Sequence, residues 1–226
     1  MIDEILSRCD HTLLKITATE GEILALVDEG AEYKTASVCI PPAFVEVAAR
    51  YAAGRVKICT VIGFPNGYST TAVKAFEAAE AVRLGADEVD MVINLGMVRS
   101  GRFSDILGEI NAVKDACAGR VLKVIIETSE LTECEIRTLC RVVSDSRADY
   151  IKTSTGFTSR GASFSDIEIM RDEVSERLKI KASGGISSIA DAEKFIALGA
   201  DRLGTSRMVK LARELKKDQN GVAKNG

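Results

Sequence analysis

The sequence predicts an α/β protein built as a single (β/α)8 TIM barrel, and three features of its pattern lead to this fold class. Short runs rich in β-branched residues alternate with longer amphipathic runs, which is typical of parallel strands joined by helices. A weak repeat, "EGAEY", "LGADE", "SRADY" and "LGADR", closes a helix and opens a strand at each copy. The copies are 55, 62 and 52 residues apart, room for two strand–helix units each, so four copies predict eight units. Eight parallel strands favour a closed barrel over an open sheet, and no G-x-G-x-x-G motif follows the first strand.

The elements follow from this alternation in chain order. A short N-terminal helix precedes the first strand, and the strands are expected at 10–16, 34–40, 56–64, 87–94, 122–128, 149–155, 180–185 and 202–206. Helices are expected at 19–30, 42–53, 70–84, 102–118, 132–146, 164–178, 188–198 and 206–217. Gly30, Gly85 and Gly199 in the repeat suit the left-handed position after a helix end. One domain therefore spans 1–226, and its polar end, about 217–226, is expected to be a loose C-terminal tail.

The composition excludes several classes of protein. Of the 226 residues, 46% are hydrophobic and 28% charged, with a net charge of −3 and no basic block, so a nucleic-acid partner is not expected. No apolar run is long enough for a membrane span, and the charged N-terminus is not a signal peptide, which predicts a cytoplasmic protein. Six scattered cysteines without a C-x-x-C pair indicate reduced thiols, and a single histidine makes a zinc site improbable. No metal and no cofactor are expected.

Four successive strands carry charged side chains on one face. Because side chains alternate along a strand, Asp90, Lys123, Lys152 and Lys181 all lie opposite the apolar faces. In a barrel the apolar faces pack under the helices and the charged faces point into the lumen. The three lysines are 29 residues apart, so we expect them at a similar level of their strands. One buried lysine is explained by a structural ion pair, but three lysines and an aspartate in one lumen indicate a functional cluster.

Such a cluster favours imine chemistry. A lysine is a nucleophile only as the free amine, and a neighbouring ammonium group and partial desolvation both favour that form. Lys152 lies between the strands that carry Lys123 and Lys181, and Asp90 can shuttle protons. We therefore expect Lys152 to form a Schiff base with a carbonyl substrate.

Glycine-rich turns follow the last strands. "SGGIS" (183–187) and "LGTS" (203–206) each lead into a helix, and "TSTGF" (153–157) follows the sixth strand. In barrels, the loops after strands 7 and 8 commonly bind a phosphate through backbone N–H groups and helix N-termini. Together with imine chemistry, this predicts a phosphorylated aldehyde or sugar as the substrate.

The motifs "DHTLL", "VCIPPAF", "VIGFPNG", "EVDMVIN", "LKVIIET", "YIKTSTGF" and "IKASGGI", in this order, resemble the deoxyribose-phosphate aldolase family over about residues 1–208. The resemblance implies a metal-independent class I aldolase. Such an enzyme reversibly cleaves 2-deoxy-D-ribose 5-phosphate into acetaldehyde and D-glyceraldehyde 3-phosphate. It also implies a homo-oligomer, with a dimer favoured.

The resemblance also assigns roles to residues. Lys152 matches the Schiff-base lysine, Lys181 the second lysine that keeps the first one neutral and shares in proton transfer, and Asp90 the acid–base aspartate. Residues that match the substrate pocket and its phosphate-binding end are Asp10, Thr12, Lys123, Thr155, Gly156, Gly184, Gly185, Gly204 and Ser206.

The chain departs from the family's pattern at three positions. Some members carry a C-terminal tyrosine that assists proton exchange, whereas this chain ends "VAKNG". Some have a lysine where this chain has Phe157, so the phosphate is expected to be held more by backbone than by charge. Ile16 stands where a proline is frequent. None of these departures affects Lys152, Lys181 or Asp90.

Two other functions fit the same pattern. A phosphosugar isomerase or cyclase needs a general acid and base but no imine, and a phosphosugar-binding protein would use the lysines only to neutralise its ligand. His11 is expected to pack or to form hydrogen bonds within a loop, and Cys39 to be a small core residue of the lumen, with a thiol reactive toward electrophiles as the alternative.

Overall fold

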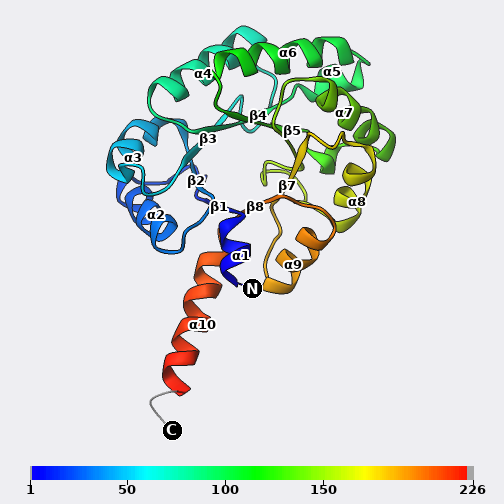
Figure 1. Ribbon diagram of the computed structural model, residues 1–226. Helices are drawn as coiled ribbons and strands as arrows, with labels where there is room; N and C mark the ends of the chain where they lie inside the picture. The colour runs from blue at the N-terminus through cyan, green and yellow to red at the C-terminus, as the bar shows by residue number, and fades with distance from the viewer. Residues whose placement is uncertain (1, 223–226) are drawn as a thin grey trace.

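The computed structural model describes residues 2–222 and shows eight parallel strands closed into a barrel (Figure 1). Each strand pairs with its neighbour in sequence, and β1 also pairs with β8, which confirms the predicted fold class. The strands are β1 (Cys9–Thr12), β2 (Ser37–Ile40), β3 (Ile58–Ile62), β4 (Glu88–Val92), β5 (Val121–Ile125), β6 (Tyr150–Lys152), β7 (Lys179–Ser183) and β8 (Arg202–Thr205).

Helices cover the outside of the barrel. They are α1 (Ile2–Ser7), α2 (Glu20–Glu32), α3 (Val45–Ala52), α4 (Thr71–Arg83), α5 (Leu95–Arg99), α6 (Phe103–Ala116), α7 (Glu133–Asp145), α8 (Phe164–Glu173), α9 (Ile189–Ala197) and α10 (Met208–Val222), with short 3-10 helices at Pro42–Phe44 and Thr128–Glu130. Four of them begin with a capping box, in which Thr19, Thr132, Ser163 or Ser188 exchanges hydrogen bonds with the acidic residue three positions later. Among residues 2–222, no helix has the length and apolar character that crossing a membrane requires.

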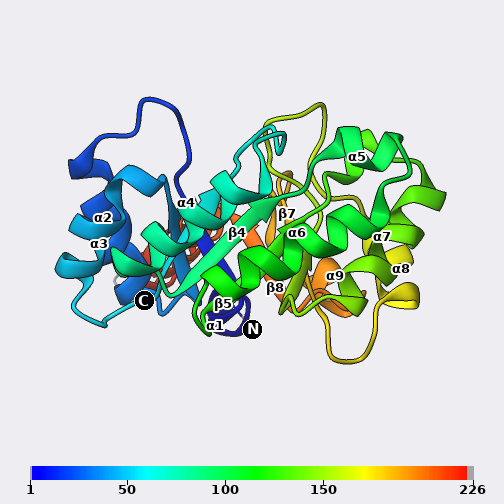
Figure 2. The ribbon, with the colours of Figure 1, turned by 90° about the horizontal axis from the view of Figure 1, so that it is seen from above.

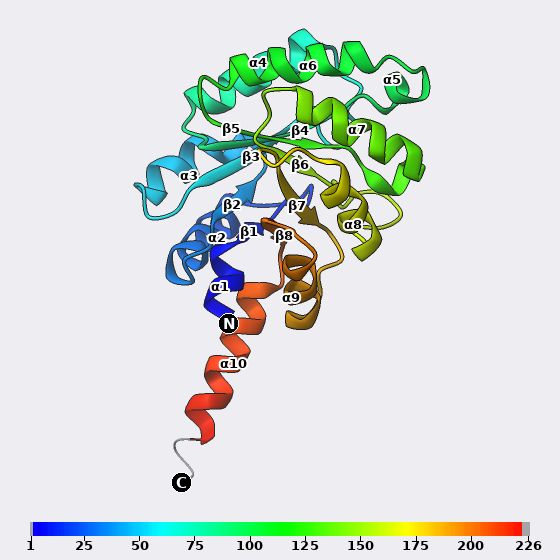
Figure 3. The same ribbon diagram turned by 45° about the vertical axis from the view of Figure 1, so that its right-hand side comes forward.

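The structure corrects three helix predictions. The short α5 was not expected from the sequence. α8 ends at Glu173 rather than 178, because Val174 takes an extended backbone and a turn follows. α10 runs on to Val222, so the first part of the expected tail is helical, and 223–226 lie outside the described residues. α10 packs beside α1 and extends away from the barrel (Figure 3).

The expected division of the strand faces is confirmed. Met91, Val124 and Ile151 are fully buried and join one core cluster with apolar residues of the helices. Cys39, Cys59 and Val61 form a separate cluster on the lumen side. The apolar faces of the strands thus pack under the helices, and the opposite faces, which include Cys39, Cys59 and Val61, line the lumen.

Glycine follows the helix end in two of the three copies where it was expected. Gly85 and Gly199 have φ of +109° and +105°. The prediction for Gly30 is wrong, because α2 continues past it and Lys34 takes the left-handed conformation instead. Gly30 is needed for close packing, since a Cβ there would lie 2.5 Å from a methyl carbon of Val38.

Candidate active site

Three lysines of the lumen converge on Asp90. Its Oδ1 accepts a hydrogen bond from the Lys123 ammonium at 2.9 Å, and its Oδ2 accepts bonds from Lys181 at 2.7 Å and Lys152 at 2.8 Å. Asp10 bonds Lys181 and lies 3.6 Å from Lys123. All five side chains are buried. The structure thus brings together the residues that the strand pattern placed in one interior.

The equal spacing of the three lysines predicted that they lie at one level of the barrel, and this prediction is wrong. Lys152 pairs with Lys181 across β6 and β7, but Lys123 pairs with Tyr150, two residues earlier on β6. Lys123 therefore lies one layer deeper in the barrel. Equal spacing along the chain does not fix equal height, because neighbouring strands in a barrel are staggered.

The electrostatics of the cluster follow from burial and charge pairing. Burial alone would raise the pKa of the Asp90 carboxyl, but the ammonium groups of Lys123 and Lys181, and that of Lys152 while it is protonated, hold it well below its usual range. Burial would lower the pKa of Lys181, but the carboxylates of Asp10 and Asp90 outweigh it and raise the pKa above its usual range. Asp90 is therefore an ionised carboxylate and Lys181 a cation.

Two charged residues at the base of this cluster were not predicted from the sequence. Glu88 lies 2.6 Å from the Lys123 ammonium, and Arg202 donates to Asp10 at 2.6 Å and lies 3.3 Å from Glu88. The signal was available, since Glu88 lies two residues before Asp90 and Arg202 two before Gly204, on the lumen faces of their strands.

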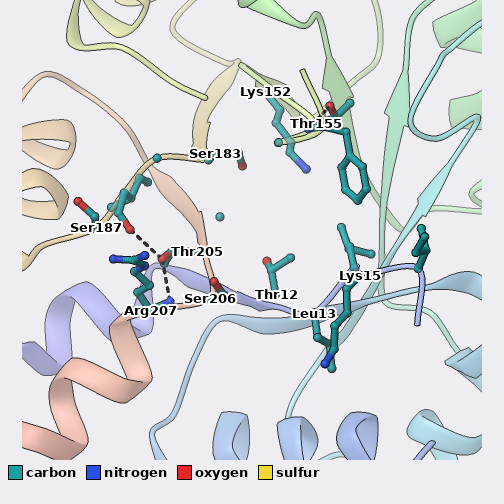
Figure 4. Close-up of a pocket in the computed structure, with 18 residues that line it drawn as sticks. Thr12, Leu13, Lys15, Lys152, Thr155, Ser183, Ser187, Thr205, Ser206 and Arg207 are labelled. Atoms are coloured by element: carbon teal, nitrogen blue, oxygen red, sulfur yellow. Dashed lines mark hydrogen bonds between the residues drawn. The ribbon is translucent and has the colours of Figure 1, made fainter. Parts of the chain in front are cut away.

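A pocket of about 810 Å³ opens above the cluster, at the carboxyl ends of the strands. Figure 2 shows the loops after β1, β3 and β6 rising on this side, opposite the N-terminus. Of the three lumen lysines, Lys152 alone lines the pocket and extends its amine into it (Figure 4). Asp10, Asp90, Lys123 and Lys181 lie beneath the lining rather than in it.

The other predicted pocket residues do line the cavity. They are Thr12, Thr155, Gly156, Gly184, Gly185, Gly204 and Ser206. Gly156, Gly184 and Gly185 have φ of +85°, +78° and +76°, conformations that other residues rarely adopt. At Gly204 a Cβ would lie 2.2 Å from the Ser183 hydroxyl oxygen. The glycines thus keep backbone exposed at one end of the pocket.

Five polar lining residues were not among the predicted site residues: Lys15, Ser183, Ser187, Thr205 and Arg207. Arg207 lies beside Ser187 and Thr205 at the glycine-rich end (Figure 4), where it directly follows "LGTS" in the sequence. Lys15 lies near the mouth and is paired with Glu22 at 2.5 Å. The Ser183 hydroxyl is buried without a hydrogen-bond partner among residues 2–222, so it is available to a bound oxygen.

Hydrogen bonds and an aromatic contact fix the position of the loop after β6. Glu127, buried and with φ of +56°, accepts hydrogen bonds from the Thr155 amide and hydroxyl and from the Thr158 hydroxyl. Phe157, on this loop, packs edge to face on Phe64 of the loop after β3, with ring centroids 5.2 Å apart. These contacts fix the lining segment that contains Thr155 and Gly156.

The contacts of His11, Cys39 and the lumen carboxylates show how each is held in the structure. His11 is hydrogen-bonded to Glu29 at 2.8 Å, as a packing residue would be. Cys39 is buried in the lumen cluster. Carboxylates and cysteines come close enough to hold a metal at Cys39–Cys59–Asp90 and Asp10–Cys59–Glu88, but the carboxylates already pair with the lumen cations. Independence from metal stays a prediction.

Known proteins resemble this chain over nearly its whole length. Residues 5–218 match the model of the DeoC/LacD family of aldolases. A deoxyribose-phosphate aldolase of Streptococcus agalactiae is 55% identical over 96% of this chain and 98% of its own length, and one of Streptococcus pyogenes is 56% identical over 94% and 95%.

Solved structures of aldolases superpose on this chain over nearly its whole length. The aldolase QR15 superposes with a TM-score of 0.91 at 38% identity, covering 96% of this chain and 97% of its own. The tetrameric deoxyribose phosphate aldolase from Aeropyrum pernix gives 0.88 at 32% identity, covering 96% and 92%. This chain therefore belongs to the DeoC/LacD family and is an aldolase, an enzyme of the lyase class.

Proposed function

We propose that this aldolase reversibly cleaves 2-deoxy-D-ribose 5-phosphate into acetaldehyde and D-glyceraldehyde 3-phosphate through a Schiff base on Lys152. The observation that carries the proposal is the position of Lys152: it lines the pocket, whereas Lys123 and Lys181 lie beneath it. Relatives at 55% identity that bear the name deoxyribose-phosphate aldolase support the substrate.

The charge balance of the lumen supports Lys152 as the nucleophile. Three carboxylates, those of Asp10, Glu88 and Asp90, face four cations, those of Lys123, Lys152, Lys181 and Arg202. The cluster is thus neutral only when one cation gives up its proton. Of the three lysines, Lys152 is the one that lines the pocket. A free amine at Lys152 therefore makes the buried cluster neutral and also supplies the nucleophile that imine formation needs.

The reaction needs a proton carrier at each stage. The Lys152 amine adds to the C1 aldehyde of the open-chain sugar, and loss of water gives the iminium. Removal of the C3 hydroxyl proton breaks the C2–C3 bond, whose electron pair moves into the iminium. D-glyceraldehyde 3-phosphate leaves, and an enamine stays on the lysine. Protonation at C2 and hydrolysis then release acetaldehyde and the free amine.

Asp90 and Lys181 serve these proton transfers. Asp90, held ionised, accepts a proton through water from the carbinolamine and returns it. Lys181 stays a cation 2.7 Å from Asp90, so its charge disfavours a second ammonium at Lys152 and favours the free amine.

The glycine-rich end binds the phosphate. Gly156, Gly185 and Ser206 offer backbone N–H groups to it, and α9 and α10 begin nearby. Gly184, whose N–H donates to the Gly204 carbonyl at 3.3 Å, and Gly204 leave room for it because they carry no side chain. Arg207 adds a positive charge there, beside the backbone groups that are expected to hold more of the phosphate than charge does where Phe157 replaces a lysine. Thr12 and Thr155 contact the sugar, with Asp10 and Lys123 supporting them from below.

Several further properties belong to the proposal. The enzyme works without metal or cofactor, in the cytoplasm, in the breakdown of deoxyribonucleotides, with no nucleic-acid or membrane partner. It assembles as a homo-oligomer, with a dimer favoured; the Aeropyrum pernix relative is tetrameric.

Product analysis with 2-deoxy-D-ribose 5-phosphate tests the proposal. We expect acetaldehyde and glyceraldehyde 3-phosphate in equal amounts, and their loss in Lys152→Arg, which keeps the charge but cannot form the same imine. Lys179→Arg, an exposed lysine of β7, is the matched control. An isomerised sugar as the product, or full turnover by Lys152→Arg, would contradict the proposal.

A further inference from the structure

Two charged residues at the base of the lumen take part in no step of the reaction described above. The Arg202 guanidinium donates to Asp10 at 2.6 Å, lies 3.3 Å from Glu88 and stacks 5.5 Å from the centre of the Tyr150 ring. Glu88 lies 2.6 Å from Lys123. Neither residue lines the pocket, so neither reaches a substrate there.

A continuous series of ion pairs nevertheless links Arg202 to Lys152. Arg202 forms an ion pair with Asp10, which also pairs with Lys181. Lys181 in turn pairs with Asp90, and Asp90 pairs with Lys152. The side chain of Arg202 is 12% exposed, and those of the other four are 4% exposed or less. Charges are weakly screened in such surroundings, so a change at Arg202 alters the electrostatic potential at Lys152.

We propose that Arg202 and Glu88 are positioning residues that set the protonation of Lys152 from beneath, with opposite effects. The inference rests on the proposed Schiff-base function. Arg202 supplies the fourth cation against three carboxylates and so favours the free amine at Lys152. Glu88 supplies the third carboxylate and so favours the ammonium form.

Other polar and titratable side chains surround the cluster, and they lie on β2, β3 and β7. Burial raises the pKa of the Cys59 thiol well above its usual range, so it adds no charge, whereas a hydrogen bond from Cys59 lowers the pKa of Cys39. Ser37 on β2 is neutral and donates to Asp10 at 2.7 Å. Lys179, at the open base, is exposed and lies 5.6 Å from the centre of the Tyr150 ring.

The test is the pH dependence of imine trapping. Wild type, Arg202→Met and Glu88→Gln are incubated with acetaldehyde and cyanoborohydride between about pH 5 and pH 10, a range that spans the titration of a perturbed lysine. Ethylation of Lys152 is quantified by peptide mass mapping, and the midpoint of its rise with pH is compared. A Cys39→Ala background removes the thiol that could titrate nearby.

Opposite shifts are expected. Arg202→Met removes a cation and moves the midpoint to higher pH, whereas Glu88→Gln removes an anion and moves it to lower pH. Each shift should be about one pH unit, equal to about a tenfold change in trapping rate below the midpoint. The double variant removes one charge of each sign, so its midpoint should return toward wild type. Arg202→Lys keeps the charge and should keep the midpoint.

Exposed Lys179→Gln is the matched control, because it removes a cation at the same end of the barrel where water screens it, and its midpoint should not move. Shifts in the same direction for both single variants, or no shift in either, would overturn the inference while leaving the imine intact. No adduct on Lys152 in wild type would instead overturn the proposed function itself. If Arg202→Met does not fold, Glu88→Gln decides alone: a midpoint at or above that of wild type contradicts the inference.

Discussion

Lys123, Lys152 and Lys181 are the same side chain in three environments. Lys123 is enclosed by Glu88, Asp90 and the Cys59 thiol, and the carboxylates of Asp10 and Asp90 are the main groups that outweigh its burial and raise its pKa. Lys181 is held between the same two carboxylates. Lys152 has one carboxylate partner and an opening to the pocket. In the proposed mechanism, this difference in partners, rather than in residue type, selects Lys152 as the nucleophile.

Arg207 provides a direct test of the phosphate end. Arg207→Ala should raise the KM for 2-deoxy-D-ribose 5-phosphate about tenfold, the loss of one charge-assisted contact, with little change in kcat. Turnover of unphosphorylated 2-deoxyribose should not change. Steady-state kinetics with both sugars measure this.

Lys210→Ala is the matched control, because Lys210 is an exposed cation of α10 outside the pocket. An equal loss with both sugars in Arg207→Ala would show that Arg207 does not recognise the phosphate.

The loops after β6 and β7 are joined where Gly161 meets Gly184. A Cβ on residue 161 would lie 2.3 Å from the carbonyl carbon of Gly184, so Gly161→Ala must displace backbone at the phosphate end. We expect the KM for the phosphorylated sugar to rise at least several-fold. Gly108→Ala, in α6 with no atom within 4 Å of the added carbon, should leave KM unchanged and stabilise the fold slightly. Unchanged kinetics in Gly161→Ala would mean that this loop contact does not order the site.

Helices α4 and α6 are joined by a fully buried ion pair. Lys74 donates to Glu109 at 2.8 Å, and burial lowers the pKa of Lys74 and raises that of Glu109. Lys74→Met leaves Glu109 buried without its partner and should lower the free energy of unfolding by about 3–5 kcal/mol.

Lys74→Met combined with Glu109→Met should recover most of that loss, because no unpaired charge remains. Urea unfolding of the two variants checks this. A double variant no more stable than the single one would show that packing rather than charge dominates at this position.

Element types were predictable because strands and helices carry different hydrophobic periods, and the eight strands and the helices between them lie where those periods change. Their ends were less predictable. Strand β6 ends at Lys152, although the Thr153 amide still donates to the Lys181 carbonyl of β7. Residue propensities alone do not predict where the strand ends. The short α5 depends on Asn94 capping the amide of Met97, a local signal too weak to predict a helix.

For the site, strand alternation was enough to place Asp90 and the lysines in one lumen. It could not give the stagger that lowers Lys123 or the pairing of Arg202 with Asp10, since both depend on how the barrel closes. Arg207 was not predicted, because the glycine-rich turn before it indicates a site formed by backbone groups, and a single arginine at the start of a helix carries no such signal.

For the molecule as a whole, the buried carboxylates predict sensitivity to acid. The pKa values of Asp10 and Asp90 lie below their usual range, against burial, because lumen cations surround both groups. Their contribution to stability is therefore fully present above the unfolded pKa of about 3.9 and is lost as pH falls below it. The free energy of unfolding in urea should fall by several kcal/mol between about pH 5 and pH 2.5.

Lys181 behaves in the opposite sense. Its raised pKa gives a contribution that is present below the unfolded value of about 10.4 and is lost only at higher pH. Stability should therefore hold on the alkaline side to about pH 10. A stability that does not change between about pH 5 and pH 2.5 would contradict the ion-pair network of the lumen.

Covalent trapping identifies the lysine that forms the imine. The protein is incubated with acetaldehyde, reduced with borohydride, digested and mapped by mass spectrometry. We predict one ethyl group, on Lys152, and none in Lys152→Leu. Ethylation of Lys181 or Lys123 in its place, or no selective adduct while deoxyribose phosphate still binds, would contradict the account.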